Sequence, residues 1–323
     1  MKTIHAQSAA SMQRDRRSLL DSFRQHKVLW IMLIPALVYF IVFCYTPMAG
    51  IWLAFTRFDF RLGFFGSPFV GLDNFQYLFK SGILWQLVRN TVLYNLAFLI
   101  IGNILQIVCA IFLSELMNKL FVKISQSVIF LPYFISMVVA AGMVVSFIEK
   151  DGLVNQIITL LGGDPVSFRT DPKWFPVVYT VTNIWKSFGW NSILYLSAMA
   201  SIDPALYESA RLDGANRWQT LWKVTIPNVM PSITICTFLT LTNSFKLFDQ
   251  NLALTGGQPY IIQSDGSAIK TTEMLALNIY NTFYGQNVNS RGTAQAKAVL
   301  FFLLVAAIGL IQLRATRKKE VQQ

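Results

Sequence analysis

Six apolar stretches divide this sequence, and each is long enough to cross a membrane as a helix. A hydrocarbon core of about 30 Å needs roughly 20 helical residues. The stretches are Val28–Phe55, Thr91–Leu113, Val128–Ile148, Pro176–Met199, Val229–Phe248 and Lys297–Leu313. With 54% hydrophobic and only 13% charged residues, the chain has little charge for a soluble domain of 323 residues. The sequence therefore predicts an all-α protein with six transmembrane helices, surrounded by membrane lipid.

The first stretch is longer than one span requires. It contains Tyr45-Thr46-Pro47, which predicts a kink or an early end near Pro47. A charged segment, residues 1–27, precedes it, and no small-residue cleavage signature follows a short apolar core. We therefore expect a retained helix rather than a removed signal peptide.

The distribution of Lys and Arg indicates which side of the membrane each loop occupies. If both termini are cytoplasmic, the inner segments hold fifteen Lys and Arg residues and the longer outer segments hold nine. This excess predicts that residues 1–27 and the basic tail 314–323 are cytoplasmic and flank a permease domain at 28–313. The outer segments 56–90, 149–175 and 249–296 are rich in Gly, Pro and aromatic residues and can form short helices.

Composition also excludes several kinds of site. The net charge of +11 does not predict nucleic-acid binding, because the basic residues lie between apolar runs rather than on one dense face. The three cysteines, Cys44, Cys109 and Cys236, are far apart, each inside an apolar run. They predict packing residues rather than a disulfide framework or a metal site.

The longest inner loop, residues 203–231, has the most structured pattern. Asp203 can cap a helix that begins at Pro204 and runs to Asp213-Gly214, where glycine permits a sharp turn. A second short helix should then place Trp218 and its apolar neighbours on one side, and Pro227 and Pro231 should stop it or redirect the chain. The pattern fits a protein-docking loop and an ordinary amphipathic interfacial helix about equally well.

A family resemblance adds to this pattern. The run Glu208-Ser209-Ala210-x-x-Asp213-Gly214-Ala215, followed by Trp218, Ile226-Pro227 and Pro231, closely resembles the EAA loop of carbohydrate-type ABC importer permeases, such as those for maltose and multiple sugars. Ser209 and Ile226 are conservative departures from the commonest motif. Three further motifs resemble the family's outer segments. The first outer loop is matched by Phe69–Phe75, the turn after the fifth span by Leu254–Gly257, and the last outer segment by Thr272-Glu273, Tyr280, Phe283 and Gly292–Ala296. An apparent insertion lies at Tyr260–Lys270.

The resemblance implies a transport subunit of a bacterial inner membrane, without enzymatic activity of its own. The 203–231 loop would be a coupling loop that docks into a cytoplasmic ATPase dimer through Glu208, Ser209, Ala210, Asp213, Gly214, Ala215, Ile226 and Pro227. A second homologous permease and an extracytoplasmic solute-binding protein would complete the importer. Independently, the chain has no Gly-x-x-x-x-Gly-Lys-Ser/Thr phosphate loop, so we expect ATP and Mg²⁺ to bind the ATPase and no cofactor to bind here.

Polar residues within the spans predict where substrate passes, because such residues are costly in a bilayer. Asn183, Lys186 and Trp190 share one helical face of the fourth span, and Asn243 and Lys246 lie near the outer end of the fifth. By resemblance, the sugar pathway comprises Asn183, Lys186, Ser187, Trp190, Asn243 and Lys246. The lysines can favour an acidic or larger glycan or merely narrow the path, and Lys246 can equally reach the membrane surface or pair with Asp249.

Other functions remain as alternatives. A permease of the same class for another polar solute fits the same motifs. An ion-coupled secondary carrier would need carboxylates within its spans, whereas nearly all acidic residues here lie in loops. A membrane-embedded enzyme would need a catalytic constellation, and the two histidines, His5 and His26, both lie in the N-terminal segment.

Overall fold

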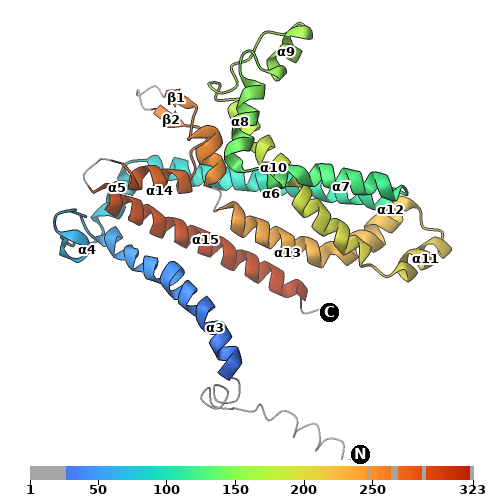
Figure 1. The fold of residues 1–323 in the computed structure, drawn as a ribbon, viewed down its shortest axis with the longest axis horizontal. Coiled ribbons are helices and arrows are strands. Elements are labelled where there is room, and N and C mark those ends of the chain that lie inside the picture. The colour runs from blue at the N-terminus through green and yellow to red at the C-terminus, as the bar shows by residue number, and fades with distance from the viewer. Residues whose placement is uncertain (1–26, 246–247, 263–267, 286–288, 321–323) are drawn as a thin grey trace, which may run out of the picture. The chain divides into compact units, whose positions relative to one another are not determined.

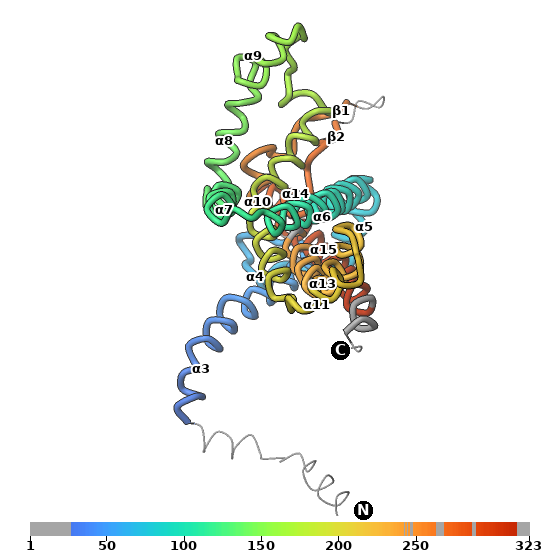
Figure 2. Tube along the Cα trace, turned by 90° about the vertical axis from the view of Figure 1, so that its right-hand side faces the viewer, coloured from blue at the N-terminus to red at the C-terminus, as the bar shows by residue number. Residues whose placement is uncertain are grey.

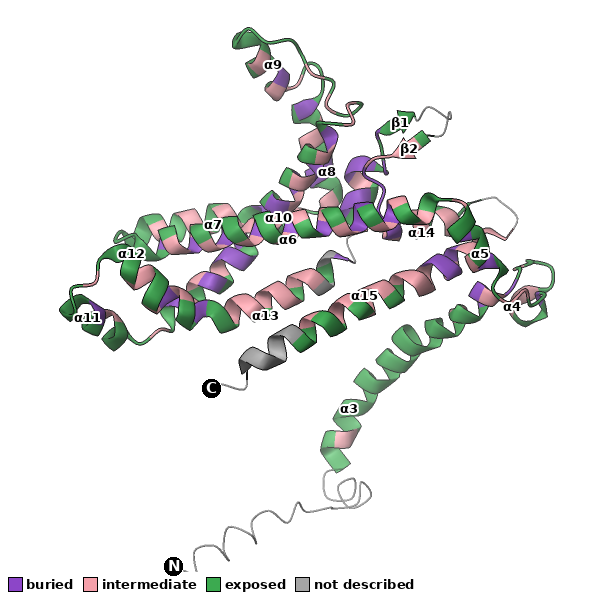
Figure 3. Ribbon diagram, turned by 180° about the vertical axis from the view of Figure 1, so that it is seen from behind, coloured by how far each residue is buried: buried purple, intermediate pink, exposed green. Residues whose placement is uncertain are grey.

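The computed structural model describes residues 27–245, 248–262, 268–285 and 289–320, and the chain divides into two compact units whose boundary in the sequence falls between Trp52 and Leu53. The first unit is helical: α3 (Lys27–Tyr39) continues into a π-helical turn, η1 (Phe40–Tyr45), and a 3₁₀ segment, η2 (Thr46–Phe55). Helical geometry thus changes one residue before Pro47, where the sequence predicted a kink or an early end. None of the residues of α3 or η1 is buried, as Figure 3 shows for α3.

The second unit is built on long helices that lie side by side (Figure 1). These are α6 (Ile83–Glu115), α7 (Lys119–Phe134), α10 (Phe175–Ala200), α13 (Ile226–Ser244) and α15 (Ser290–Glu320). Figure 2 shows the same bundle from one end. Within the described residues, four helices are long and apolar enough to span a membrane: Lys27–Phe55, Ile83–Glu115, Arg217–Leu241 and Ser290–Arg314. A bent pair can supply a fifth, and the predicted count of six stays a prediction.

The fourth predicted span corresponds to α10, which is long enough to cross a bilayer but is not among the four helices that are apolar enough to span one. Its 26 residues extend about 39 Å. Its polar groups find partners on neighbouring helices: the Tyr195 hydroxyl donates to Asn103 Oδ1 on α6 at 2.8 Å, and Asn103 Nδ2 donates to Thr237 on α13 at 3.3 Å. Helix α10 tolerates this polarity because it packs against α6, α7 and α13 rather than facing lipid on all sides.

The third predicted span, Val128–Ile148, is not one straight helix. It is broken between α7 and α8 (Met137–Ile148), and the pair bends by 102°. Two local features account for the break: Pro132 lies in the last turn of α7, and the Ser136 side chain caps α8 by accepting from Val139 N at 3.3 Å. Composition could not show this, because the apolar run continues through the bend.

Short elements occupy the segments predicted to be outside. They are α4 (Gly63–Gly66), α5 (Asp73–Lys80), α9 (Leu153–Leu160), the π-turn η4 (Asn251–Thr255) and α14 (Leu275–Phe283). The expectation of an all-α fold misses one antiparallel hairpin, in which β1 (Tyr260–Ile262) pairs with β2 (Ala268–Lys270). The hairpin lies in the segment that the sequence marks as an apparent insertion.

The core consists of two main clusters along α10. Tyr179 packs with Phe98, Phe175 and Met274 near one end of the helix, and Tyr195 packs with Ala110, Met199 and Val229 near the other. Between them, Gly189 allows α10 and α7 to approach closely: a β-carbon there would collide with the backbone of Ile129 and Phe130. These contacts fix α10 as the central helix of the second unit.

Candidate functional site

The 203–231 loop forms a helical cap at one end of the bundle, formed by α11 (Pro204–Leu212) and α12 (Arg217–Thr220) (Figure 1). Asp203 caps α11 as predicted, with its carboxylate accepting from Ala205 N at 2.9 Å. Asn216 and Gln219 form a reciprocal capping box at the start of α12. The local sequence therefore specifies both helix starts.

The turn between these helices depends on Gly214. Its φ of +73° lies in the left-handed region, which disfavours any residue with a β-carbon. Hydrogen bonds close the turn: Gly214 N donates to Arg211 O, and Ala215 N donates to Ala210 O at 2.9 Å. A β-carbon at Gly214 would meet no atom within 4 Å. Within this chain, glycine is therefore needed here for its backbone conformation and not because space is short.

The predicted docking residues have different exposures. Glu208, Ser209, Asp213, Gly214 and Pro227 are exposed, and most of the ribbon of α11 and α12 has the colour of exposed residues in Figure 3. Ala210 is buried, while Ala215 and Ile226 are partly buried. Among the described residues, no basic group forms an ion pair with Glu208. Its carboxylate is therefore available to a partner.

The inner face of this loop contacts the ends of the long helices. The hydroxyls of Tyr207 and Thr225 are 3.2 Å apart, which joins α11 to the π-turn η3 (Leu221–Thr225). A cavity of about 840 Å³ lies between the loop and the ends of α6 and α10. An ion pair of Arg217 with Glu115, 3.8 Å apart, joins α12 to the end of α6, and the cavity leaves open space beside this contact.

The two prolines do not end the second helix, which excludes one of the two alternatives that the sequence predicted. α12, η3 and α13 run on as a single helix from Arg217 to Leu241. Ile226 N donates to Leu221 O, five residues back, and this wider turn lies directly before Pro227, whose missing N–H leaves one hydrogen bond of the continuous helix unmade. A movement of α12 would therefore reach α13 without a flexible joint.

Lys186, predicted to line the substrate pathway, contacts the bend between α7 and α8. Its Nζ donates to Pro132 O at 3.3 Å, Tyr133 O at 3.4 Å and also to Ile135 O. The carbonyls at a helix C-terminus lack intrahelical partners and carry partial negative charge. Lys186 thus satisfies the end of α7, and nothing in this arrangement requires a substrate.

Of the other residues predicted to line the pathway, Asn183, Ser187 and Trp190 lie on α10, and Asn243 lies on α13. Asn183 Nδ2 donates to Gln250 Oε1 at 2.6 Å, and Gln250 Nε2 in turn donates to Tyr179 O. The Ser187 hydroxyl donates to Asn183 O within its own helix. Trp190 is exposed and stacks on Tyr133, with ring centroids 4.8 Å apart. Asn243 is exposed near the end of α13, and Lys246 lies outside the described residues.

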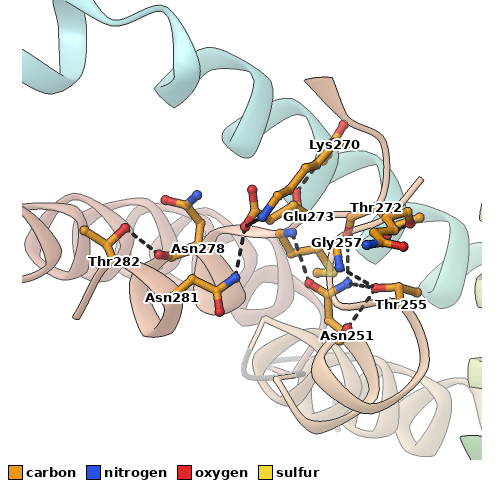
Figure 4. Close-up of polar contacts among 12 residues, drawn as sticks. Asn251, Thr255, Gly257, Lys270, Thr272, Glu273, Asn278, Asn281 and Thr282 are labelled. Carbon is orange, nitrogen blue, oxygen red and sulfur yellow. Dashed lines mark hydrogen bonds and ion pairs between the residues drawn. The ribbon is translucent and has the colours of Figure 1, made fainter. Parts of the chain in front are cut away.

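Sequence reasoning missed a polar network near the other end of the bundle (Figure 4). The buried Asn251 bonds Thr255, Thr272 O and Met274 N, and the buried Glu273 accepts from Lys270 at 3.1 Å and Asn281 at 3.2 Å. Close by, the buried Lys297 donates to Asn278 at 2.6 Å and Thr282 at 2.7 Å. Thr255, Thr272 and Glu273 belong to motifs noted in the sequence, but no local pattern indicates that these motifs meet in the fold.

This network joins the hairpin to the helices. Asn90 on α6 donates to the backbone oxygens of Lys270, Thr271 and Glu273, and a cavity of about 620 Å³ lies beside Glu273 and Lys297. The buried charges are paired or hydrogen-bonded, as buried charges must be. The arrangement is that of a structural anchor between α6, α14 and α15.

Comparison with known proteins gives concordant results. The family model described as "Binding-protein-dependent transport system inner membrane component" matches residues 102–320. The polygalacturonan/rhamnogalacturonan transport system permease protein of Bacillus subtilis is 34% identical over 253 residues, which are 76% of this chain and 79% of that protein. The probable starch degradation products transport system permease protein of Thermoanaerobacterium thermosulfurigenes is 33% identical over 91% of this chain and 95% of its own length.

Solved structures agree with these sequence relatives. The crystal structure of a bacterial ABC transporter involved in the import of the acidic polysaccharide alginate contains a chain with a TM-score of 0.80 and 31% identity. The match covers 93% of this chain and 98% of that one. A chain of the same TM-score comes from the alginate transporter in complex with an alginate pentasaccharide-bound periplasmic protein.

Proposed function

This chain belongs to the family of binding-protein-dependent transport system inner membrane components, and from that premise we propose how its parts serve transport. It is a membrane subunit of a carbohydrate ABC importer. The proposed substrate is an oligosaccharide, which passes from an extracytoplasmic binding protein through the membrane by alternating access. The names of the relatives, which refer to polysaccharides and their fragments, support that substrate class.

The proposed topology has six spans with both termini in the cytoplasm of a bacterial cell. Lys and Arg counts support it, and so does the separation of the 203–231 loop from the α14 and hairpin segments at opposite ends of the bundle (Figure 1). In this topology the polar helix α10 is the fourth span, and the bent pair α7 and α8 forms the third.

The proposed partners are a second homologous permease, a cytoplasmic ATPase dimer that binds ATP and Mg²⁺, and the solute-binding protein. The observation that carries the ATPase contact is the exposed Glu208, which has no ion-pair partner among the described residues, on a short helix that ends at the Gly214 turn. A basic residue on the ATPase would pair with this carboxylate. Ser209, Ala210, Asp213, Ala215, Ile226 and Pro227 would shape the rest of the contact.

The continuous helix from α12 into α13 gives this contact a mechanical consequence. When ATP closes the ATPase dimer, force on α11 and α12 would be transmitted to α13 as movement of a rigid element between two states. Asn243 lies near the far end of that helix, and Asn183 and Trp190 lie on α10. We assign these three residues, with Ser187 and Lys246, to the sugar pathway, and Lys186 to its supporting structure.

Charge reversal at Glu208 tests the docking proposal. Glu208→Lys should abolish co-purification of the ATPase with the permease pair, or should leave basal ATP hydrolysis that no longer responds to the loaded binding protein. Asp151→Lys is the matched control, since Asp151 is an exposed acid in the segment assigned to the outside. Normal assembly and stimulated ATP hydrolysis in Glu208→Lys would contradict the proposed docking role.

A further inference from the structure

A ladder of aromatic rings continues outward from the end of α13. The Phe248 ring lies 4.7 Å from Tyr280 on α14, and Tyr280 lies 4.7 Å from Tyr284. Tyr280 and Tyr284 are exposed, Tyr284 to 68%. A hollow of about 300 Å³ lies against these rings and is also lined by Ala276 and Gln295. This volume is at the lower end of the range for small-molecule pockets, which suits one ring rather than a chain segment of a protein.

An arginine beside the ladder is held by rings rather than by acids. The guanidinium carbon of Arg291 lies 4.0 Å from the centre of Phe60 and 5.3 Å from the centres of Phe58 and Phe283. Phe283 connects this cage to the ladder, because its ring centroid is 5.3 Å from that of Tyr284. Among the described residues, no carboxylate or carbonyl accepts from the Arg291 side chain.

The aromatic ladder and Arg291 together match the chemistry of one kind of sugar. Stacking on aromatic faces fixes the guanidinium plane and leaves its in-plane N–H groups free, in the fork geometry that matches a carboxylate. A pyranose presents apolar C–H groups on its ring faces, which suit tyrosine rings, and hydroxyls on its rim, which suit the Tyr hydroxyls and Gln295. A hexuronic acid carries both the ring and the carboxylate.

We propose that the Phe248–Tyr280–Tyr284 ladder and Arg291 form an outer subsite for an acidic sugar unit of the transported oligosaccharide. The inference rests on the proposed function, and it names the substrate class. Phe248 lies five residues beyond Asn243, so the subsite is at the outer end of the proposed pathway in the topology given above. The ladder would receive a sugar ring before it reaches α10, and Arg291 would favour uronate over neutral units.

The test is a binding measurement on the complete importer, with both permease subunits and the ATPase in lipid nanodiscs. Trigalacturonate and maltotriose serve as acidic and neutral probes, titrated by calorimetry without binding protein. The wild type should bind trigalacturonate more tightly than maltotriose, and Arg291→Gln should weaken trigalacturonate about tenfold, which matches the loss of a hydrogen bond to a charged group, with little change for maltotriose. Arg291→Lys should restore part of the difference, and Tyr284→Leu should weaken both probes.

Controls separate this subsite from a structural or interface role. Arg169→Gln removes an arginine that pairs with Glu149 at 3.1 Å in another outer segment, and Tyr260→Leu removes an exposed tyrosine of the hairpin; neither should change binding. Equal losses for both probes in Arg291→Gln, or loss of the second permease on purification, would overturn the inference. If carbohydrate with binding protein still stimulates ATP hydrolysis while Arg291→Gln binds both probes normally, the inference fails and the proposed function stands.

Discussion

At the scale of single residues, the hydrogen-bond partners of Lys186 change the function that its side chain suggests. A lysine within a span, without a carboxylate on its own helix, is typical of a transport pathway. In the folded chain its ammonium group donates instead to backbone oxygens at the end of α7, including those of Pro132 and Tyr133. The cation offsets the partial negative charge of a helix C-terminus, so the partly buried ammonium group needs no acidic partner.

Replacement of this lysine distinguishes the structural role from substrate contact. Lys186→Met should lower the stability of the permease by about 1–3 kcal/mol, because carbonyls at the bend lose their donor. Half-saturating substrate concentration should change little in the protein that folds. Thermal unfolding of the reconstituted importer and transport kinetics measure the two effects, with the exposed Lys173→Met as control. Normal stability with an altered substrate preference would show instead that Lys186 contacts sugar.

At the scale of secondary structure elements, the packing of α7 on α10 depends on one absent side chain. A β-carbon at Gly189 would collide with α7 backbone at Ile129 and Phe130, and Trp190 next to it stacks on Phe130 and Tyr133. The approach of the two helices and the position of Trp190 in the proposed pathway therefore depend on the same contact. Small residues have this role in membrane helix pairs generally.

Gly189→Val should separate α7 from α10. We expect a loss of at least about 1–3 kcal/mol of stability, the usual cost of overpacking, since backbone rather than a flexible side chain must move. Gly142→Ala on α8 is the control, because its β-carbon would meet nothing within 4 Å and alanine favours a helix. The unfolding temperatures of the two variants in nanodiscs provide the comparison. Equal temperatures would show that α7 and α10 are not in close contact in the membrane.

Local signals in the sequence predicted some elements well. Helix α11 begins after the capping side chain of Asp203, at Pro204, and ends just before Gly214, whose backbone permits the turn. These local preferences were sufficient to predict both ends of the helix. The bend after α7 was not predicted, because Pro132 and Ser136 lie in an apolar run that looks continuous. Of the two outcomes predicted for the prolines after α12, an end of the helix is not found, because a π-turn precedes Pro227 and the helix continues.

At the scale of the whole molecule, sequence patterns predicted which segments are helical but not which of them meet. Asn90, Asn251, Glu273 and Lys297 are spread over more than half of the chain, yet their hydrogen bonds gather in one region, in which Figure 4 labels Asn251 and Glu273. Nothing local to any of them specifies that meeting. The candidate docking loop could be predicted from the sequence because one continuous segment forms it. The pathway and the outer network could not, because they depend on tertiary contacts.

The orientation of the molecule follows from charge and can be tested directly. In a chain whose Cys44, Cys109 and Cys236 are replaced by alanine, a cysteine is introduced at Ser209 on α11 or at Tyr260 in the hairpin, both of which are exposed. A membrane-impermeant maleimide should label Tyr260→Cys in intact spheroplasts and Ser209→Cys only after permeabilisation. This outcome is required if the ATPase is to reach α11 while the binding protein reaches the α14 end, because the two partners act on opposite sides of the bilayer. Labelling of Ser209→Cys from outside would invert the topology, and it would remove the docking proposal together with the outer subsite.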